Sequence, residues 1–489
     1  MRCMTCALHN LTAHQLLAAY ADGSLCPVEV TQDVLAHIER WELHLHATWL
    51  LRPEAALAQA RESETRWRKG QPLGPLDGVP ITLKDNIATA GDPLPLGTRA
   101  VPLLPSRADA PPAARLREAG AVLVSKTTMP DYGMLSSGLS SFHPLSRNPW
   151  DLALTPGGSS AGAGAAAAAG YGPLHLGTDI GGSIRLPAAW CGVVGFKPSL
   201  GRVPIDPPYM GRAAGPMTRT VADAALIMQV LAQPDARDSM ALPPQVIDWA
   251  SVWQQEDQHL SRLRGLKIGL LLDAGCGLAV EPAIHAAVAQ AAHLFEAHGA
   301  VVKPITPWMT PGLLSGLDHF WRMRSLLDLD ALPPEQRHAV LPVIRTWAES
   351  ARGMSGADVF RAYSATHATR VATQQALRGL DYVISPVSPN TPAQAEWPSP
   401  TNDPLRGLEH IGFTVPFNMG EQPAISINCA AMPSPATPGA VLPIGLQIAG
   451  QRFDDLGVLE LARAFEQIRG PQPPWPAPPA QAAENTRAP

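Results

Sequence analysis

The sequence predicts an α/β fold, and two patterns indicate it. In the second half of the chain, an apolar strand (266–272) is followed by an amphipathic helix (281–298) and another strand (300–305). This alternation is typical of a core in which helices pack against a sheet. Two further apolar runs, 78–84 and 121–124, have the length of strands rather than of helices.

The other elements follow from periodicity, taken in chain order. Residues 11–65 are predicted to form two helices, since Leu16 and Tyr20 share one helical face and Val34 and Ile38 share another. A short helix over 113–119 should end at Gly120, which suits a helix C-terminus. The later elements are helices within 307–380, a proline-rich loop over 386–423, a strand at 445–448, a helix at 456–468 and a disordered Pro/Ala-rich tail over 471–489.

The composition is that of a globular protein with a large core and no nucleic-acid partner. Of 489 residues, 46% are hydrophobic and 16% are charged, and the formal net charge is −5. The basic residues form no cluster, whereas a nucleic-acid-binding face is strongly basic. The length allows two to four domains, but we find no internal repeat and no clear linker. We therefore predict a single domain over residues 1–489.

Neither a membrane segment nor a metal site is expected. An apolar run such as the alanines 165–169 is far too short to cross a bilayer. No secretory segment follows Met1, so we expect a soluble, cytoplasmic protein without a membrane partner. Cys3 and Cys6 have the spacing of a zinc or redox pair, but no second pair follows, and we interpret them as ordinary thiols. We expect no metal and no cofactor.

Two segments rich in small residues are the candidates for chemistry. The segment 156–162 reads Pro-Gly-Gly-Ser-Ser-Ala-Gly and leads into a run of alanines, so a helix should begin near Ser160 with Ser159 at or near its N-cap. The segment 177–187 reads Gly-Thr-Asp-Ile-Gly-Gly-Ser-Ile-Arg-Leu-Pro. Two glycines before a serine allow several backbone N–H groups to converge on one point, as an oxyanion hole requires. Each segment alone would be interpreted as a loop.

Together the two segments resemble the signature of the amidase-signature family, with Ser159 and Ser183 24 residues apart. The resemblance extends to Leu-Asp-Gly-Val-Pro-Ile-Thr-Leu-Lys-Asp at 76–85, and it covers roughly residues 11–470. It implies the amidase-signature fold, a central mixed, twisted sheet covered by helices on both faces. The signature core would span about 70–230, and 307–380 would be a variable helical insert on the substrate side.

The resemblance also implies a serine mechanism. Ser183 would be the nucleophile, Ser159 a bridging serine on a cis peptide, and Lys84 the general base. The N–H groups of Ile180, Gly181, Gly182 and Ser183 would form the oxyanion hole. The physical chemistry supports these roles, because a buried lysine loses the hydration of its ammonium group and can become a neutral base. Asp179 and Arg185 are interpreted as a structural ion pair.

The substrate is less determined by the sequence. Ser-Gly-Leu-Ser-Ser at 137–141 departs from the family's common pattern, and 307–380 is rich in aromatic residues. Both features favour a stand-alone hydrolase of a neutral amide with an apolar or aryl side, with esters and carbamates as further substrates. Candidate substrate-binding residues are Met134, Ser137 and Trp321. Phe320, Trp321, Met323, Leu326 and Leu327 are expected to share one helix face, more as core than as pocket.

Two alternative functions remain open. Within the family, the chain could be the A subunit of a tRNA-dependent amidotransferase, which releases ammonia from glutamine for a partner. Outside it, Gly158 to Gly162 fits the Gly-x-Ser-x-Gly nucleophile elbow of an α/β-hydrolase esterase, with Ser160 as nucleophile. That elbow requires a strand directly before it, and 149–156 has the composition of a loop. The expected partner is a small amide, and a homodimer is compatible with the sequence.

Overall fold

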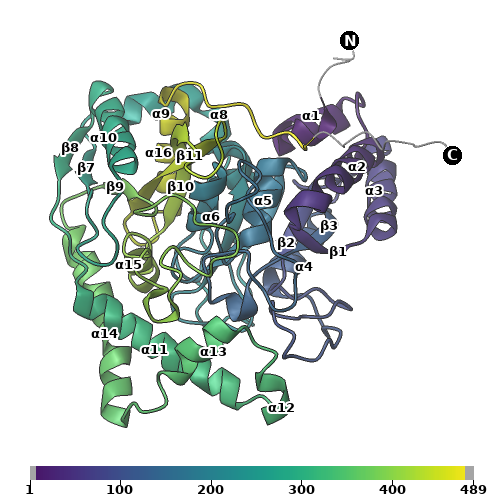
Figure 1. The fold of residues 1–489 in the computed structure, drawn as a ribbon. Helices are drawn as coiled ribbons and strands as arrows, with labels where there is room; N and C mark the ends of the chain where they lie inside the picture. The colour runs from purple at the N-terminus through teal and green to yellow at the C-terminus, as the bar shows by residue number, and fades with distance from the viewer. Residues whose placement is uncertain (1–6, 480–489) are drawn as a thin grey trace.

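Eleven strands form one mixed sheet within residues 7–479, the part of the chain that the computed structural model describes (Figure 1). The strands are β1 (Thr48–Leu51), β2 (Pro80–Lys84), β3 (Val122–Thr127), β4 (Leu174–Asp179), β5 (Val194–Lys197), β6 (Ala213–Thr218), β7 (Lys267–Leu270), β8 (Val301–Pro304), β9 (Tyr382–Pro386), β10 (Ala424–Pro433) and β11 (Val441–Gly450). Their order across the sheet is β1-β3-β2-β4-β6-β5-β10-β11-β9-β7-β8. Strand β2 is parallel to β3 and β4, and β7 is parallel to β8 and β9, while the other pairs are antiparallel.

Helices cover both faces of this sheet, as the sequence predicts. They are α1 (Ala13–Ala21), α2 (Pro27–Leu45), α3 (Pro53–Arg68), α4 (Pro111–Glu118), α5 (Ala161–Ala169), α6 (Arg185–Cys191), α7 (Val221–Leu231), α8 (Ser251–Gln254), α9 (Glu256–Arg262), α10 (Pro282–Ala297), α11 (Pro311–Asp330), α12 (Pro334–Arg337), α13 (Pro342–Glu349), α14 (Gly356–Ala376), α15 (Val415–Met419) and α16 (Asp455–Ile468). On β11, a Cβ atom added to Gly445 would meet Ala189 of α6, and one added to Gly450 would meet Val458 of α16. These positions are an odd number of residues apart and therefore face opposite sides of the strand.

The N-terminal region contains more structure than the two helices expected over 11–65. Helices α1 and α2 are followed by strand β1, which pairs antiparallel with β3 at the edge of the sheet, and then by helix α3. Helix α3 buries only Ala56, Ala60 and Ser63. Because small residues make a weak apolar stripe, the periodicity of the sequence does not reveal this helix.

Two other predictions need correction. The expected loop 386–423 contains the short buried helix α15, whose five residues are too few to show a helical period. Of the tail 471–489 that was predicted to be disordered, residues 480–489 lie outside the described residues, and residues 471–479 have no regular structure but contact the body of the protein. The ring of Trp475 lies 6.1 Å from that of Trp150 and 4.5 Å from the guanidinium of Arg219. An aromatic anchor of this kind holds a segment that composition alone predicts to be disordered.

The helical segment expected over 307–380 consists of α11 to α14, which lie together at the lower edge of the molecule in Figure 1. Helix α11 buries Leu314, Leu317 and Trp321 at helical spacing, whereas Leu327 is 63% exposed. The prediction that one helix face runs from Phe320 to Leu327 was therefore wrong for Leu327. The face that α11 buries includes Trp321, and it delivers that side chain towards the end of β4.

Candidate active site

Lys84 is the last residue of β2, and its side chain is fully buried. Its Nζ donates hydrogen bonds to Ser159 Oγ (2.8 Å) and to Thr178 Oγ1 (3.0 Å) on the neighbouring strand β4. Burial lowers the pKa of Lys84 to about 7, and the charges of Asp179 and Asp85 only partly oppose this. A large share of Lys84 is thus neutral near pH 7, which is the state that a general base needs.

Ser159 follows a cis peptide bond, Gly158–Ser159, as the family resemblance implies. The N-cap of α5 is the next residue, Ser160, rather than Ser159. The Ser160 hydroxyl donates to the Thr178 carbonyl and accepts from the Thr178 N–H, both at 3.2 Å. These bonds tie the start of α5 to strand β4 and leave Ser159 directed at Lys84.

Ser183 lies at the wall of a cavity and is the most exposed of the three predicted catalytic residues. The Ser160 N–H donates to the Ser183 carbonyl at 3.1 Å, so the two serine-bearing segments are in direct contact. Gly133 lines the same cavity, and a Cβ atom added to it would lie 3.2 Å from Ser159 Oγ. Lys84, Ser159 and Ser183 therefore form a series that leads from the interior to the cavity.

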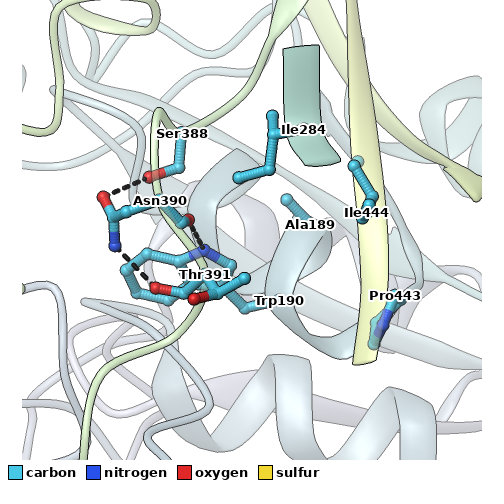
Figure 2. Close-up of a pocket in the computed structure, with 9 residues that line it drawn as sticks. Ala189, Trp190, Ile284, Ser388, Asn390, Thr391, Pro443 and Ile444 are labelled. Carbon is cyan, nitrogen blue, oxygen red and sulfur yellow. Dashed lines mark hydrogen bonds between the residues drawn. The ribbon is translucent and has the colours of Figure 1, made fainter. Parts of the chain in front are cut away.

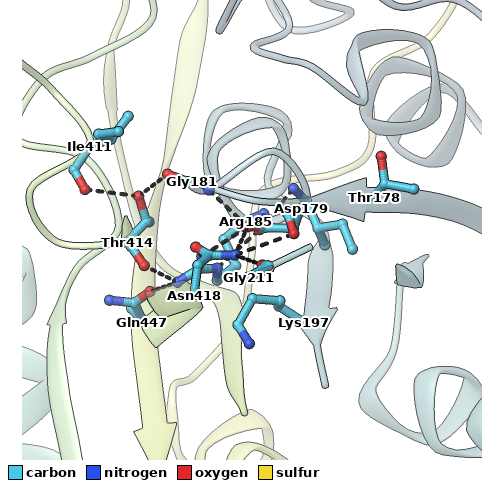
Figure 3. Close-up of polar contacts among 12 residues, drawn as sticks. Thr178, Asp179, Gly181, Arg185, Lys197, Gly211, Ile411, Thr414, Asn418 and Gln447 are labelled. Atoms are coloured by element: carbon cyan, nitrogen blue, oxygen red, sulfur yellow. Dashed lines mark hydrogen bonds and ion pairs between the residues drawn. The ribbon is translucent and has the colours of Figure 1, made fainter. Parts of the chain in front are cut away.

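The loop after β4 is organised by the carboxylate of Asp179 (Figure 3). This carboxylate accepts the N–H of Gly182 at 2.8 Å and that of Ile184 at 3.0 Å. Gly182 was expected to contribute to the oxyanion hole, but its N–H is already engaged with Asp179. The N–H groups of Ile180, Gly181 and Ser183 thus remain as our predicted donors to an oxyanion.

Asp179 and Arg185 form the buried ion pair that we expected, with Nη2 and Oδ1 3.0 Å apart. Burial raises the pKa of Asp179, but the charges of Arg185 and Lys197 and the hydrogen bonds from Arg185 and Asn418 together hold this pKa below its ordinary value. Arg185 also donates to the side chains of Gln447 and Asn418 and to the carbonyl of Thr414. A buried pair with its remaining hydrogen bonds satisfied is rigid, so the C-terminal segment supports the loop before Ser183.

Thr414 holds the same loop from the other side (Figure 3). Its hydroxyl lies 2.6 Å from the carbonyl oxygen of Gly181 and 3.1 Å from that of Ile411. The peptide between Gly181 and Gly182 is therefore held at its carbonyl by Thr414 and at its N–H by Asp179. Gly182 has φ +128°, which L side chains rarely adopt, and an added Cβ would lie 2.6 Å from Thr414 Oγ1.

We predict that Thr414→Val lowers kcat about tenfold and leaves KM nearly unchanged. The substitution keeps the shape of the side chain but removes one hydrogen bond, worth about 1–1.5 kcal/mol, from the loop that places the oxyanion donors. Thr414→Ser retains the hydroxyl and should keep most of the activity. Steady-state kinetics with thermal melting as a fold control would check this, and equal losses in both variants would contradict it.

The cavity beside Ser183 is lined mainly by apolar side chains. Its lining residues are Gly133, Met134, Leu135, Ser136, Ile180, Gly181, Ser183, Leu186, Trp321, Arg324, Leu408 and Ile411. Met134 and Trp321 are thus where the sequence placed them. Ser137 is not: it is fully buried behind the wall, and its hydroxyl accepts the N–H of Leu139 at 3.1 Å. Leu408 and Ile411 were missed because they belong to the segment expected to be a loop.

A second cavity, on α6, is unsuited to an amide substrate (Figure 2). It holds only about 10 Å³, enough for about one water molecule. Its polar groups are used within the protein: Ser388 Oγ donates to Asn390 Oδ1, and Trp190 Nε1 donates to the Asn390 carbonyl. The described residues that line it include no activated nucleophile and no base, so the Ser183 cavity remains the candidate site.

The nucleophile elbow with Ser160 is contradicted by the structure. No strand directly precedes Ser160 in the described chain, since the residues from Asn148 to Thr155 form only isolated bridges. Ser160 is also fully buried and bonded to Thr178, away from the Ser183 cavity. An elbow serine must instead be exposed at the end of a strand.

Two further observations concern metal ions and membranes. Among the side chains of residues 7–255 and 258–479, no three His, Cys, Asp or Glu are grouped so that they could hold a metal ion. Cys3 and Cys6 lie outside the described residues. Within the same part of the chain, none of the helices has the length and apolar character needed to span a bilayer.

Comparisons with known proteins point to one family. A family model described as Amidase matches residues 29–459. The A subunit of the glutamyl-tRNA(Gln) amidotransferase of Myxococcus xanthus is 35% identical, over 94% of this chain and 97% of that protein. Its counterpart from Chloroflexus aggregans is 34% identical, with the same coverage. A solved structure of a bacterial aryl acylamidase of the amidase signature enzymes matches with a TM-score of 0.83 and 28% identity, over 94% of this chain and 96% of that chain.

Proposed function

The chain belongs to the amidase family and is an amide-hydrolysing enzyme, and we propose that it acts through an acyl-enzyme on Ser183. Neutral Lys84 accepts the proton of Ser159 while Ser159 accepts that of Ser183. Ser183 Oγ then attacks the amide carbonyl, and the N–H groups of Ile180, Gly181 and Ser183 stabilise the oxyanion. The proton returns through Ser159 to the leaving nitrogen, and water releases the acyl group.

We propose that the group beside the scissile bond is apolar or aromatic. The observation that carries this proposal is the lining of the Ser183 cavity, where Leu186, Trp321 and Ile411 offer apolar surface. A neighbouring cavity shares Met134, Leu135 and Leu408 with it, so the two cavities adjoin at these residues. Esters and carbamates of similar shape fit the same chemistry.

The cavity beside Ser183 and its neighbour are small, about 40 Å³ and about 20 Å³. An apolar cavity of about 150 Å³ is known to accept a benzene ring. Binding of an aryl group therefore requires the side chains between the cavities to move. Met134 and Leu408 can do so, because unbranched methionine adapts readily and Leu408 lies on a segment without regular structure.

Hydrolysis of glutamine for a partner is the second candidate, and the curated relatives favour it over the first. Those relatives are A subunits of an amidotransferase by name. The cavity lining favours the first candidate, because none of the described residues that form it has a carboxylate that could pair with the α-ammonium group of glutamine. A stand-alone enzyme, as a monomer or a homodimer, is our proposal for its assembly.

Acetanilide and glutamine, offered separately at equal concentration to the isolated chain, distinguish these candidates. We expect faster release of aniline from acetanilide than of ammonia from glutamine, because the anilide matches the apolar part of the lining and no described lining residue offers a carboxylate to the α-ammonium group of glutamine. Rates would be measured by chromatography and by a coupled ammonia assay, with Ser183→Ala as the blank. Faster ammonia release, especially if a second protein stimulates it, would replace our proposal by the amidotransferase function.

A further inference from the structure

One arginine lines the Ser183 cavity, and the register of the sheet places a second one near it. Arg324 of α11 lines the cavity directly. Arg212 directly precedes β6, whose first residue, Ala213, is paired with Asp179 of β4. This register places Arg212 across from Ile180, which is both a predicted oxyanion donor and a lining residue of the cavity. Arg212 is also one of the charges that lower the pKa of Lys84, after burial.

Tyr209 connects the two arginines. The guanidinium carbon of Arg324 lies 4.4 Å from the centre of the Tyr209 ring, a cation–π contact. The backbone N–H of Arg212 donates to the Tyr209 carbonyl at 3.0 Å. The short loop between Asp206 and Arg212 thus contacts Arg324 through Tyr209 and ends at Arg212.

Arg212 has no carboxylate partner within ion-pair distance in the described part of the chain. Its Nη2 donates to the carbonyl of Pro207, and its buried Nε has no hydrogen-bond partner among the described residues. Burial lowers the pKa of Arg212, and the largest charge effect after burial comes from Arg324, another cation. The acidic groups that act on it are Asp238, whose carboxylate already accepts the N–H groups of Ile205 and Met240, and Asp206.

Arg324 is also only partly paired. Its Nε is 3.7 Å from Asp328 Oδ2, beyond hydrogen-bond distance, and the Asp328 side chain is 44% exposed. Partly buried guanidinium groups with unused donors are costly unless an anion binds to them. Guanidinium groups match the planar, two-oxygen geometry of a carboxylate.

We propose that Arg212 and Arg324 bind a carboxylate group of the substrate, so that the enzyme's preferred amides carry a carboxylate at one end. This inference rests on the proposed amide hydrolysis at Ser183 and narrows its substrate class. It replaces the expectation of a neutral amide by an amide with an apolar part beside the scissile bond and an anionic end beyond it. Arg212 and Arg324 are specificity residues in this assignment and take no part in proton transfer.

Two matched pairs of anilides test the proposal by steady-state kinetics. Acetanilide and 4-acetamidobenzoate differ by a carboxylate on the leaving side, and butyranilide and succinanilate differ by one on the acyl side. In at least one pair, we expect kcat/KM to be about tenfold to a hundredfold higher for the carboxylate member, mainly through KM, as expected for charge-assisted hydrogen bonds. A preference for the neutral member in both pairs would overturn the proposal.

The variants Arg212→Gln and Arg324→Gln should each abolish this preference by raising the KM of the carboxylate member much more than that of the neutral member. Arg361→Gln is the matched control, because Arg361 is 72% exposed on α14 and pairs with Asp358; it should retain the preference. A preference that survives in both cavity variants would exclude these arginines as its source.

Binding to Ser183→Ala separates this inference from the proposed function. If none of the four anilides is hydrolysed, the proposed substrate class fails. Calorimetry with 4-acetamidobenzoate and succinanilate then still tests the carboxylate site. We expect at least one probe to bind to Ser183→Ala. This binding should be lost when Arg212→Gln or Arg324→Gln is combined with Ser183→Ala. No binding of either probe, or binding unchanged by both substitutions, would refute the carboxylate site.

Discussion

Ser183→Ala is expected to lower turnover of every amide substrate by at least about 10³-fold, because the hydroxyl that forms the acyl-enzyme is lost. Lys84 and Ser159 would remain hydrogen-bonded to each other, so the fold should be unaffected. Initial rates with acetanilide, together with a thermal melting curve, would check this. The variant should also fail to show the burst of leaving group that accompanies accumulation of an acyl-enzyme.

Neighbouring serines provide the controls for this experiment. Ser159→Ala should lose most of the activity, because Lys84 would then have no hydroxyl through which to act. Ser160→Ala should keep most of it, since Ser160 only ties α5 to Thr178. An inactive but folded Ser160→Ala beside a fully active Ser183→Ala would mean that the nucleophile has been misassigned.

Lys84→Met is expected to reduce kcat/KM by several orders of magnitude and to remove the main pH dependence of the reaction. Burial lowers the pKa of Lys84 to about 7, and only the neutral amine can accept a proton. Activity of the wild type should therefore rise with pH up to about 7 and be constant above it. A pH–rate profile of kcat/KM from pH 5 to pH 9, roughly two units on each side of this pKa, would measure it.

Other titrating groups could produce a similar rise of kcat/KM with pH. The Lys84→Met variant distinguishes their contribution from that of Lys84. Lys197 also has a pKa lowered by burial to about 7, but its ammonium group donates to the carbonyls of Pro198 and Gln422. His410 precedes the cavity residue Ile411, and burial lowers its pKa to about 3. If the residual kcat/KM of Lys84→Met still rises with pH near pH 7, Lys84 is not the general base.

Much of the fold could be predicted, because the signals for its elements are local. The strands that contain Lys84 and residues 121–124 are short apolar runs in the sequence. Helix α5 is predicted by its run of alanines and glycines. Small residues are needed there for a physical reason. A Cβ atom added to Gly162 would lie 2.1 Å from the carbonyl oxygen of Ala47. Helix α3 and helix α15 were missed because a weak or very short apolar stripe carries little periodic signal.

The candidate site was only partly predictable, because hydrogen bonds between distant segments decide its details. Nothing local distinguishes the engaged N–H of Gly182 from its neighbours, and the difference arises from the side chain of Asp179. Thr414 lies more than 200 residues from Gly181 along the chain, yet it holds the Gly181 carbonyl. Ser137 and Ser136 are adjacent in sequence, but only Ser136 faces the cavity.

By itself, the sequence determined the chemical class of this protein. The two glycine-serine segments and the lysine strand have a spacing and composition that serve one type of chemistry, and these are local properties of the chain. The tertiary structure decided what that chemistry can act on. The cavity is assembled from α11, the segment 408–411 and the end of β4, and the loop before β6 brings Arg212 beside it. A binding pocket is a property of side chains that meet across the fold, and their meeting depends on packing that no single segment encodes.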